Sequence, residues 1–161
     1  MPLPIPMTPY SLARQFLGMR ELSAPGKDHG WIRWALSLVG MGPEAPDETP
    51  WCSAFVAAIA WHFPGVPRSR SAAARSWLDV GKPVGLSVAS PGFDVVVLSR
   101  GRLPQPGADV MYGPGRYPPG HVGFFDGIQG SSVLVLGGNQ GNAVTVDSFP
   151  MERVLGFRRL E

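Results

Sequence analysis

The hydrophobic pattern of this chain changes its period near the middle, and this change limits the folds open to it. Before residue 81, apolar stretches begin at capping residues and end at glycine, which is typical of helices. After residue 92 the apolar runs are short and separated by glycine-rich turns, which is typical of strands. Helices followed by a meander of strands predict an α+β domain, with N-terminal helices packed on a central antiparallel sheet. The predicted strands are 93–99, 121–127, 131–138, 143–149 and 154–160.

Capping residues mark four predicted helices in the first half of the chain. Thr8 and Thr49 are each followed by proline, a combination that favours a helix start. Asp28 and Ser71 can cap two further helices, which end at glycines. Between the first two strands, residues 100–120 are too rich in glycine and proline to be regular, and a loop of that length is usually functional.

Composition excludes several classes of protein. The 161 residues are enough for one domain, 1–161, with a proline-rich tail at 1–7. The net charge is only +2 and the basic residues are scattered, so we expect no nucleic-acid partner. The N-terminus lacks a signal-peptide pattern, and no apolar run is long enough to insert in a membrane. A single cysteine and the lack of metal-ligand motifs predict no disulfide, metal or organic cofactor.

The single cysteine, Cys52, allows two interpretations. If Thr49 caps its helix, Cys52 is the third helical residue, near unpaired backbone N–H groups and the positive end of the helix dipole. That position favours the thiolate, which is the nucleophilic form. A cysteine on an apolar helix face, however, most often serves only to pack. The position alone does not decide between packing and catalysis.

A nucleophilic cysteine needs a base, and His121 is the best candidate. His62 lies ten residues along the same helix, roughly 15 Å away, and His29 falls in a capping region. His121 opens a strand that is apolar on both faces and is therefore central, although such a histidine is often only a core residue. Asn139, at the end of the next strand, is our choice for orienting the imidazole, with Gln140 as the alternative.

Six segments, taken together, resemble a known family. They are ETPWCSAFV, SAAARSWLDVGKPV, PGFDVVVLSRG, GHVGFFDG, VLGGNQGNAVTV and VLGFRRL, and they span about residues 21–160. In this order they resemble bacterial and phage proteins related to the NlpC/P60 and CHAP peptidoglycan hydrolases. The resemblance implies a papain-like α+β fold, with Cys52 as the nucleophile, His121 as the base and Asn139 as the orienting residue.

The reaction that this resemblance implies is hydrolysis of an amide bond in peptidoglycan by a thiol mechanism. The backbone N–H of Cys52 or Ser53 would hold the oxyanion. Trp51, Gln140 and Tyr117 are candidates for substrate contacts, Tyr117 within the long loop. The chain has no room for a separate wall-binding domain, and we expect a monomer.

Several alternatives remain open from the sequence. Without a signal peptide, the protein would be made in the cytoplasm and reach the wall or periplasm by another system, as a phage endolysin or as a secreted effector. An effector would have an immunity protein as a partner. A non-catalytic wall-binding or virion structural domain could share the scaffold, and so could a cysteine protease or acyltransferase with another amide substrate. The sequence does not specify which peptidoglycan bond is cut.

Overall fold

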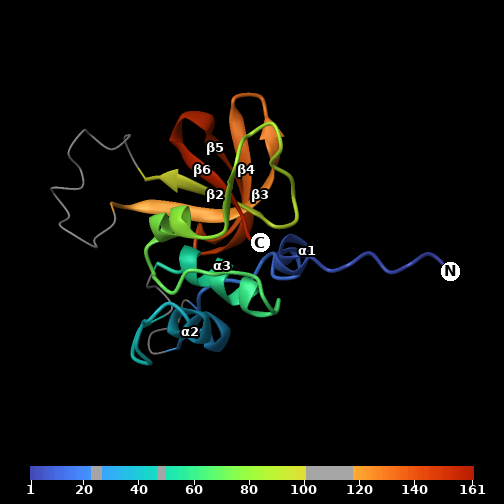
Figure 1. The fold of residues 1–161 in the computed structure, drawn as a ribbon. Coiled ribbons are helices and arrows are strands. Elements are labelled where there is room, and N and C mark those ends of the chain that lie inside the picture. The colour runs from blue at the N-terminus through green and yellow to red at the C-terminus, as the bar shows by residue number, and fades with distance from the viewer. Residues whose placement is uncertain (23–26, 47–49, 101–117) are drawn as a thin grey trace.

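The fold is a six-stranded antiparallel sheet with helices packed on one face (Figure 1). It comes from a computed structural model that describes residues 1–22, 27–46, 50–100 and 118–161. The strand order is β1-β6-β2-β3-β4-β5, and every paired neighbour is antiparallel. The predicted α+β class with an antiparallel sheet is therefore confirmed.

The five predicted strands are all present, with small shifts at their ends. One further strand, β1, was not predicted because it has only three residues and contains Pro83. Proline lacks the N–H that a central strand needs, and β1 is an edge strand that pairs only with β6. The strands are β1 Lys82–Val84, β2 Asp94–Ser99, β3 Gly120–Gln129, β4 Ser132–Gln140, β5 Ala143–Pro150 and β6 Val154–Arg159.

The helices lie where the sequence predicts them, but some of the predicted capping residues do not occupy the N-cap position. Thr8 caps the first helix through a reciprocal pair of hydrogen bonds with Ser11, as a capping box does. Asp28 is not the cap of the second helix, because the cap position is occupied by His29. Ser71 accepts a hydrogen bond from the Ala73 N–H, ahead of a 3₁₀ helix. The helices are α1 Pro9–Arg14, α2 Gly30–Ser37, α3 Cys52–Trp61, η1 Ala74–Asp79 and η2 Met151–Arg153.

Helix α3 lies between the sheet and α2 (Figure 1). Its residues 52–60 are all buried, which fits a helix that is apolar around its whole circumference. Trp31 of α2 packs its ring 6.0 Å from the ring of Phe55, centroid to centroid, on α3. Because α3 is held from both sides, its first turn has a fixed place against the sheet.

Side chains of β3 alternate between two apolar clusters. Val122 and Phe124 belong to the cluster on the helix side of the sheet, together with α3. Phe125 belongs to the cluster on the opposite face, where its ring meets Phe157 at 5.5 Å. Strand side chains alternate with a period of two, so His121 leaves β3 on the same face as Phe125.

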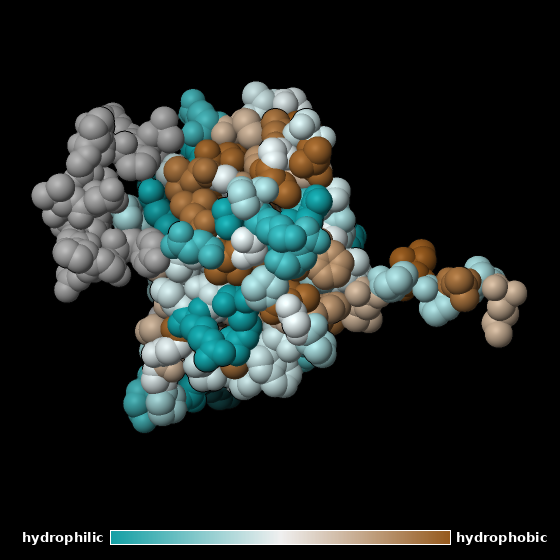
Figure 2. Space-filling view, in the orientation of Figure 1, coloured by the Kyte–Doolittle hydropathy of each residue, from teal (hydrophilic) through white to brown (hydrophobic). Residues whose placement is uncertain are grey.

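Residues 1–7 project from the body of the domain and expose their apolar side chains (Figures 1 and 2). No helix within the described ranges has the length and apolar character that a membrane span requires. Within those same ranges, no group of three or more His, Cys, Asp or Glu side chains is arranged to hold a metal ion.

Candidate active site

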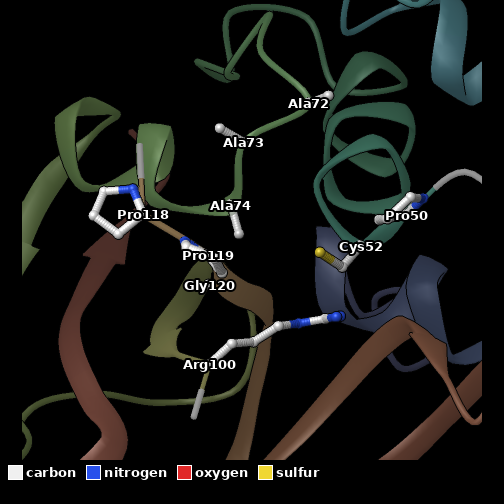
Figure 3. Close-up of a pocket in the computed structure, with 9 residues that line it drawn as sticks. All are labelled: Pro50, Cys52, Ala72, Ala73, Ala74, Arg100, Pro118, Pro119 and Gly120. Carbon is white, nitrogen blue, oxygen red and sulfur yellow. The ribbon is translucent and has the colours of Figure 1, made fainter. Parts of the chain in front are cut away.

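Cys52 is the first residue of α3, and its side chain is only 4% exposed. The helix begins later than predicted: Trp51 is at the N-cap position, and Thr49 lies outside the described residues. The cysteine borders a cavity of about 200 Å³, toward which Arg100 extends from the far wall (Figure 3). The other lining residues are Pro50, Ala72, Ala73, Ala74, Pro118, Pro119 and Gly120.

The thiol of Cys52 is not ionised by its position at the helix start. Burial raises its pKa above the usual thiol value, and this is the largest effect on the group. Backbone hydrogen bonds from Val122, Ser53 and Cys52 itself lower the pKa, as does the positive charge of Arg100, but together they are smaller. Burial therefore opposes the thiolate form that we expected the helix N-terminus to favour.

His121 is held by a buried hydrogen-bond network at the start of β3. Its Nε2 lies 2.8 Å from Oε1 of Gln140. The amide nitrogen of Gln140 donates to the carbonyl oxygens of Val135 and Thr145 and to the Thr145 hydroxyl. That hydroxyl in turn donates to Asp147. Since the amide nitrogen is engaged elsewhere, its oxygen must accept from His121, so Nε2 carries the proton and Nδ1 is the basic nitrogen.

Burial also sets the charge of His121. Its pKa is lowered from 6.5 to about 4, chiefly because burial disfavours the charged imidazolium. The hydrogen bond to Gln140 and the charge of Asp147 act in the opposite direction, while Arg100 and Arg153 lower the pKa further. At neutral pH the imidazole is therefore neutral, which is the form that can accept a proton.

The hydrogen bond that we expected from Asn139 is made by Gln140. The register of β4 and β5 shifts between Gly137 and Gln140, and Asn139 has a φ of 58° within this bulge. A bulge of this kind redirects the side chains that follow it. As a result Gln140 reaches His121, while Asn139 lines the same cavity without that contact.

Cys52 and His121 meet the same end of β3 from different sides. The backbone of Val122, the residue after His121, lowers the pKa of the Cys52 thiol, and Val122 packs in the same apolar cluster as Cys52. His121 borders a second cavity, of about 320 Å³, and Arg100 is the residue that lines both cavities. Among the described residues, no hydrogen bond joins the thiol directly to the imidazole.

Trp51 is not a wall of a substrate groove, contrary to our expectation. Its side chain is fully buried, and its Nε1 donates to Glu21 over 2.8 Å. Gly138 lies against the ring so closely that an added Cβ would come within 2.5 Å of it. Trp51 therefore belongs to the core, because the end of β4 covers it.

The Ser53 side chain also has a structural role. Its hydroxyl donates to the Ser71 carbonyl and accepts from Trp77 Nε1, and both Ser53 and Trp77 are fully buried. Only the backbone N–H of Ser53 is directed at the cysteine sulfur. Tyr117, the other expected substrate contact, lies outside the described residues.

Four residues with charged or hydroxyl side chains in the two cavities or their network were not singled out from the sequence: Arg100, Thr145, Asp147 and Arg153. Thr145 and Asp147 interrupt an apolar strand with period two, and that pattern could have indicated a polar face. Arg100 and Arg153 are separated by more than fifty positions, and no local pattern connects them.

The fold and site define an α+β domain with a buried cysteine at a helix start and a buried histidine–glutamine pair on the sheet. No protein-family model matches this chain, and no curated protein is significantly similar to it.

Proposed function

We propose that this protein is a cysteine peptidoglycan hydrolase on a papain-like fold of the NlpC/P60 type. Cys52 is its nucleophile, His121 its base and Gln140 its orienting residue. The observation that carries the proposal is the hydrogen bond of 2.8 Å between His121 and Gln140 at the start of β3, where the backbone of the next residue, Val122, lowers the pKa of the Cys52 thiol. An oriented imidazole at the strand end that Cys52 packs against is the arrangement that a thiol mechanism needs.

In this reaction the thiol proton of Cys52 passes through a water molecule to Nδ1 of His121, because the two side chains meet this end of β3 from different sides, and the sulfur attacks the carbonyl carbon of the substrate amide. The C–N bond then breaks, and the leaving amine takes the proton from His121. A water molecule attacks the resulting thioester while His121 accepts one of its protons. The C–S bond breaks, the carboxylic acid leaves, and the proton returns to the sulfur.

Backbone N–H groups at the start of α3 would stabilise the oxyanion that forms during both attacks. The first intrahelical bond runs from the Phe55 N–H to the Trp51 carbonyl, so the N–H groups of residues 52–54 precede the helical ladder. Those of Cys52 and Ser53 lower the pKa of the thiol. Donors fixed in this way stabilise the transition state without reorganisation.

Peptidoglycan as the substrate rests on the six sequence segments that resemble wall hydrolases. The cationic groups around the two cavities support it, because the stem peptides of peptidoglycan carry carboxylates. The biological setting under this proposal is a phage endolysin or an effector delivered to another cell.

The test is digestion of purified Gram-negative peptidoglycan, with the products analysed by mass spectrometry. Wild type is expected to release new fragments, whose masses identify the bond, while Cys52→Ala and His121→Ala release none. His62→Ala is the matched control, because His62 lies at the far end of α3 and should leave activity intact. Equal fragments from wild type and Cys52→Ala would contradict the proposal.

A second candidate, a non-catalytic peptidoglycan-binding domain, is favoured by one observation. The pKa of Cys52 is raised and that of His121 is lowered, so at neutral pH the thiol and the imidazole are both neutral. They do not form the thiolate–imidazolium pair that many cysteine hydrolases use. This candidate predicts that wild type and Cys52→Ala bind insoluble peptidoglycan equally well and that neither releases fragments.

A further inference from the structure

The cavity beside His121 contains two guanidinium groups and one carboxylate. Its volume is about 320 Å³, far more than the roughly 30 Å³ that a water molecule occupies. Its charged lining residues are Arg100, Arg153 and Asp147, and His121 is neutral there because of its lowered pKa. The remaining lining residues are Asn139, Gln140, Gly141 and Phe149. The cavity therefore has a net positive charge.

Arg153 is held rigidly at one side of this cavity. Its Nε donates to the Ser99 carbonyl oxygen over 2.9 Å, and its guanidinium lies 5.3 Å from the ring centroid of Phe149. These contacts engage one nitrogen and one face of the group. The two terminal nitrogens keep the planar fork geometry that matches a carboxylate.

Arg100 places the second guanidinium between the two cavities. Its backbone N–H donates to the Pro119 carbonyl, which fixes where the side chain begins. Its charge acts on both Cys52 and His121, lowering the pKa of each. In the described part of the chain, no carboxylate forms an ion pair with Arg100 or Arg153.

Asp147 does not neutralise this pair of arginines. It accepts a hydrogen bond from the Thr145 hydroxyl, which supports Gln140, and its own side chain is exposed. Arg100 and Arg153 therefore both line the cavity at His121, while the Asp147 carboxylate is hydrogen-bonded to Thr145. A carboxylate of the substrate would complement the charge of the two arginines.

We propose that this cavity binds a free carboxylate of the substrate, on the residue next to the amide bond that is cut. The inference rests on the proposed function and specifies its substrate: an acidic stem peptide rather than an amidated one. Because Arg100 also lines the Cys52 cavity, a carboxylate bound at Arg100 and Arg153 lies in a cavity that adjoins the one at Cys52. Arg100 and Arg153 therefore determine specificity.

The experiment compares two muropeptides that differ only in amidation of the carboxyl group beside the cut bond. The expected result is a kcat/KM roughly 10- to 100-fold higher for the free acid, the range of a lost charge-assisted hydrogen bond. Arg153→Gln is expected to reduce this preference by slowing cleavage of the free acid more than cleavage of the amidated peptide. Lys82→Gln, a charge loss on the edge strand β1, is the control and should keep the preference.

Binding provides a readout that does not depend on catalysis. In Cys52→Ala, calorimetry should show tighter binding of the free acid, and Cys52→Ala/Arg153→Gln should bind both peptides equally. Equal cleavage of both peptides by wild type would overturn this inference and leave the hydrolase proposal standing. If the Arg153→Gln variant lost cleavage of the free-acid peptide and of the amidated peptide to the same extent, the inferred carboxylate site would be overturned too. Cleavage of neither peptide by wild type would overturn the hydrolase proposal, and this inference with it.

Discussion

The side-chain oxygen of Gln140 lies 2.8 Å from Nε2 of His121, and the nitrogen of the same amide donates into the β4–β5 hairpin. The turn of that hairpin consists of Gly141 and Asn142, which both have positive φ. Two such residues form the type I′ turn that matches the twist of paired strands. The turn places Gln140 opposite Ala143, so the hairpin determines which nitrogen of His121 carries the proton.

Removal of the Gln140 side chain should impair catalysis more than removal of the Asn139 side chain. In Gln140→Ala the His121 N–H loses its acceptor, which corresponds to about one to two orders of magnitude in kcat/KM. Asn139→Gly keeps the positive φ and leaves the hydrogen bond intact, so its activity should stay within about threefold of wild type. ¹⁵N NMR of the imidazole should show an Nε2–H tautomer in wild type that is lost in Gln140→Ala. The reverse order of activities would restore Asn139 as the orienting residue.

Stability should fall as the pH decreases from about 6.5 to 4. Folding lowers the pKa of His121 from 6.5 to about 4, so in this range the unfolded state binds a proton that the folded state excludes. The free energy of unfolding should drop by up to about 3 kcal/mol between these two pH values. Below pH 4, His121 should have no further effect on stability. Urea unfolding at several pH values should show a steeper dependence in wild type than in His121→Gln. Parallel curves would contradict the burial of a neutral imidazole.

Alkylation of Cys52 should depend on pH with an apparent pKa above that of free cysteine, about 8.5. The protein has a single cysteine, so the mass increase from iodoacetamide reports this site alone. Arg100→Gln should move the midpoint to still higher pH, because the charge of Arg100 lowers the pKa of the thiol. The midpoint, rather than the absolute rate, is the quantity compared, since burial slows access in every variant. A midpoint near neutral pH would indicate a thiolate that burial does not suppress.

Gly138→Ala should destabilise the protein by about 1–3 kcal/mol, the usual cost of overpacking a core. The added Cβ would lie 2.5 Å from the Trp51 ring and 2.7 Å from Cβ of Phe55, so α3 would have to move away from β4. Gly85→Ala is the matched control, because nothing lies within 4 Å of a Cβ at that position. Thermal unfolding of both variants measures the difference. Equal melting temperatures would show that Trp51 is less tightly packed than described.

The sequence by itself determined the order and type of the main elements. The change of hydrophobic period places helices before strands, and the Thr8 cap depends only on residues within one turn. It also indicated Cys52, His121 and the segment containing Gln140 as candidates for a site, because the chemistry of these side chains is intrinsic. These features depend on local geometry or on residue type, which a sequence carries directly.

Only the tertiary structure decided how those residues are used. The bulge in β4 selects Gln140 over Asn139, and it depends on pairing with β5. The burial of Trp51 depends on Gly138, nearly ninety positions away, and the meeting of Arg100 with Arg153 depends on the fold of β2 against β6. The pKa shifts of Cys52 and His121 also depend on the tertiary structure. Their main cause is desolvation, which arises only when distant parts of the chain pack around the two side chains.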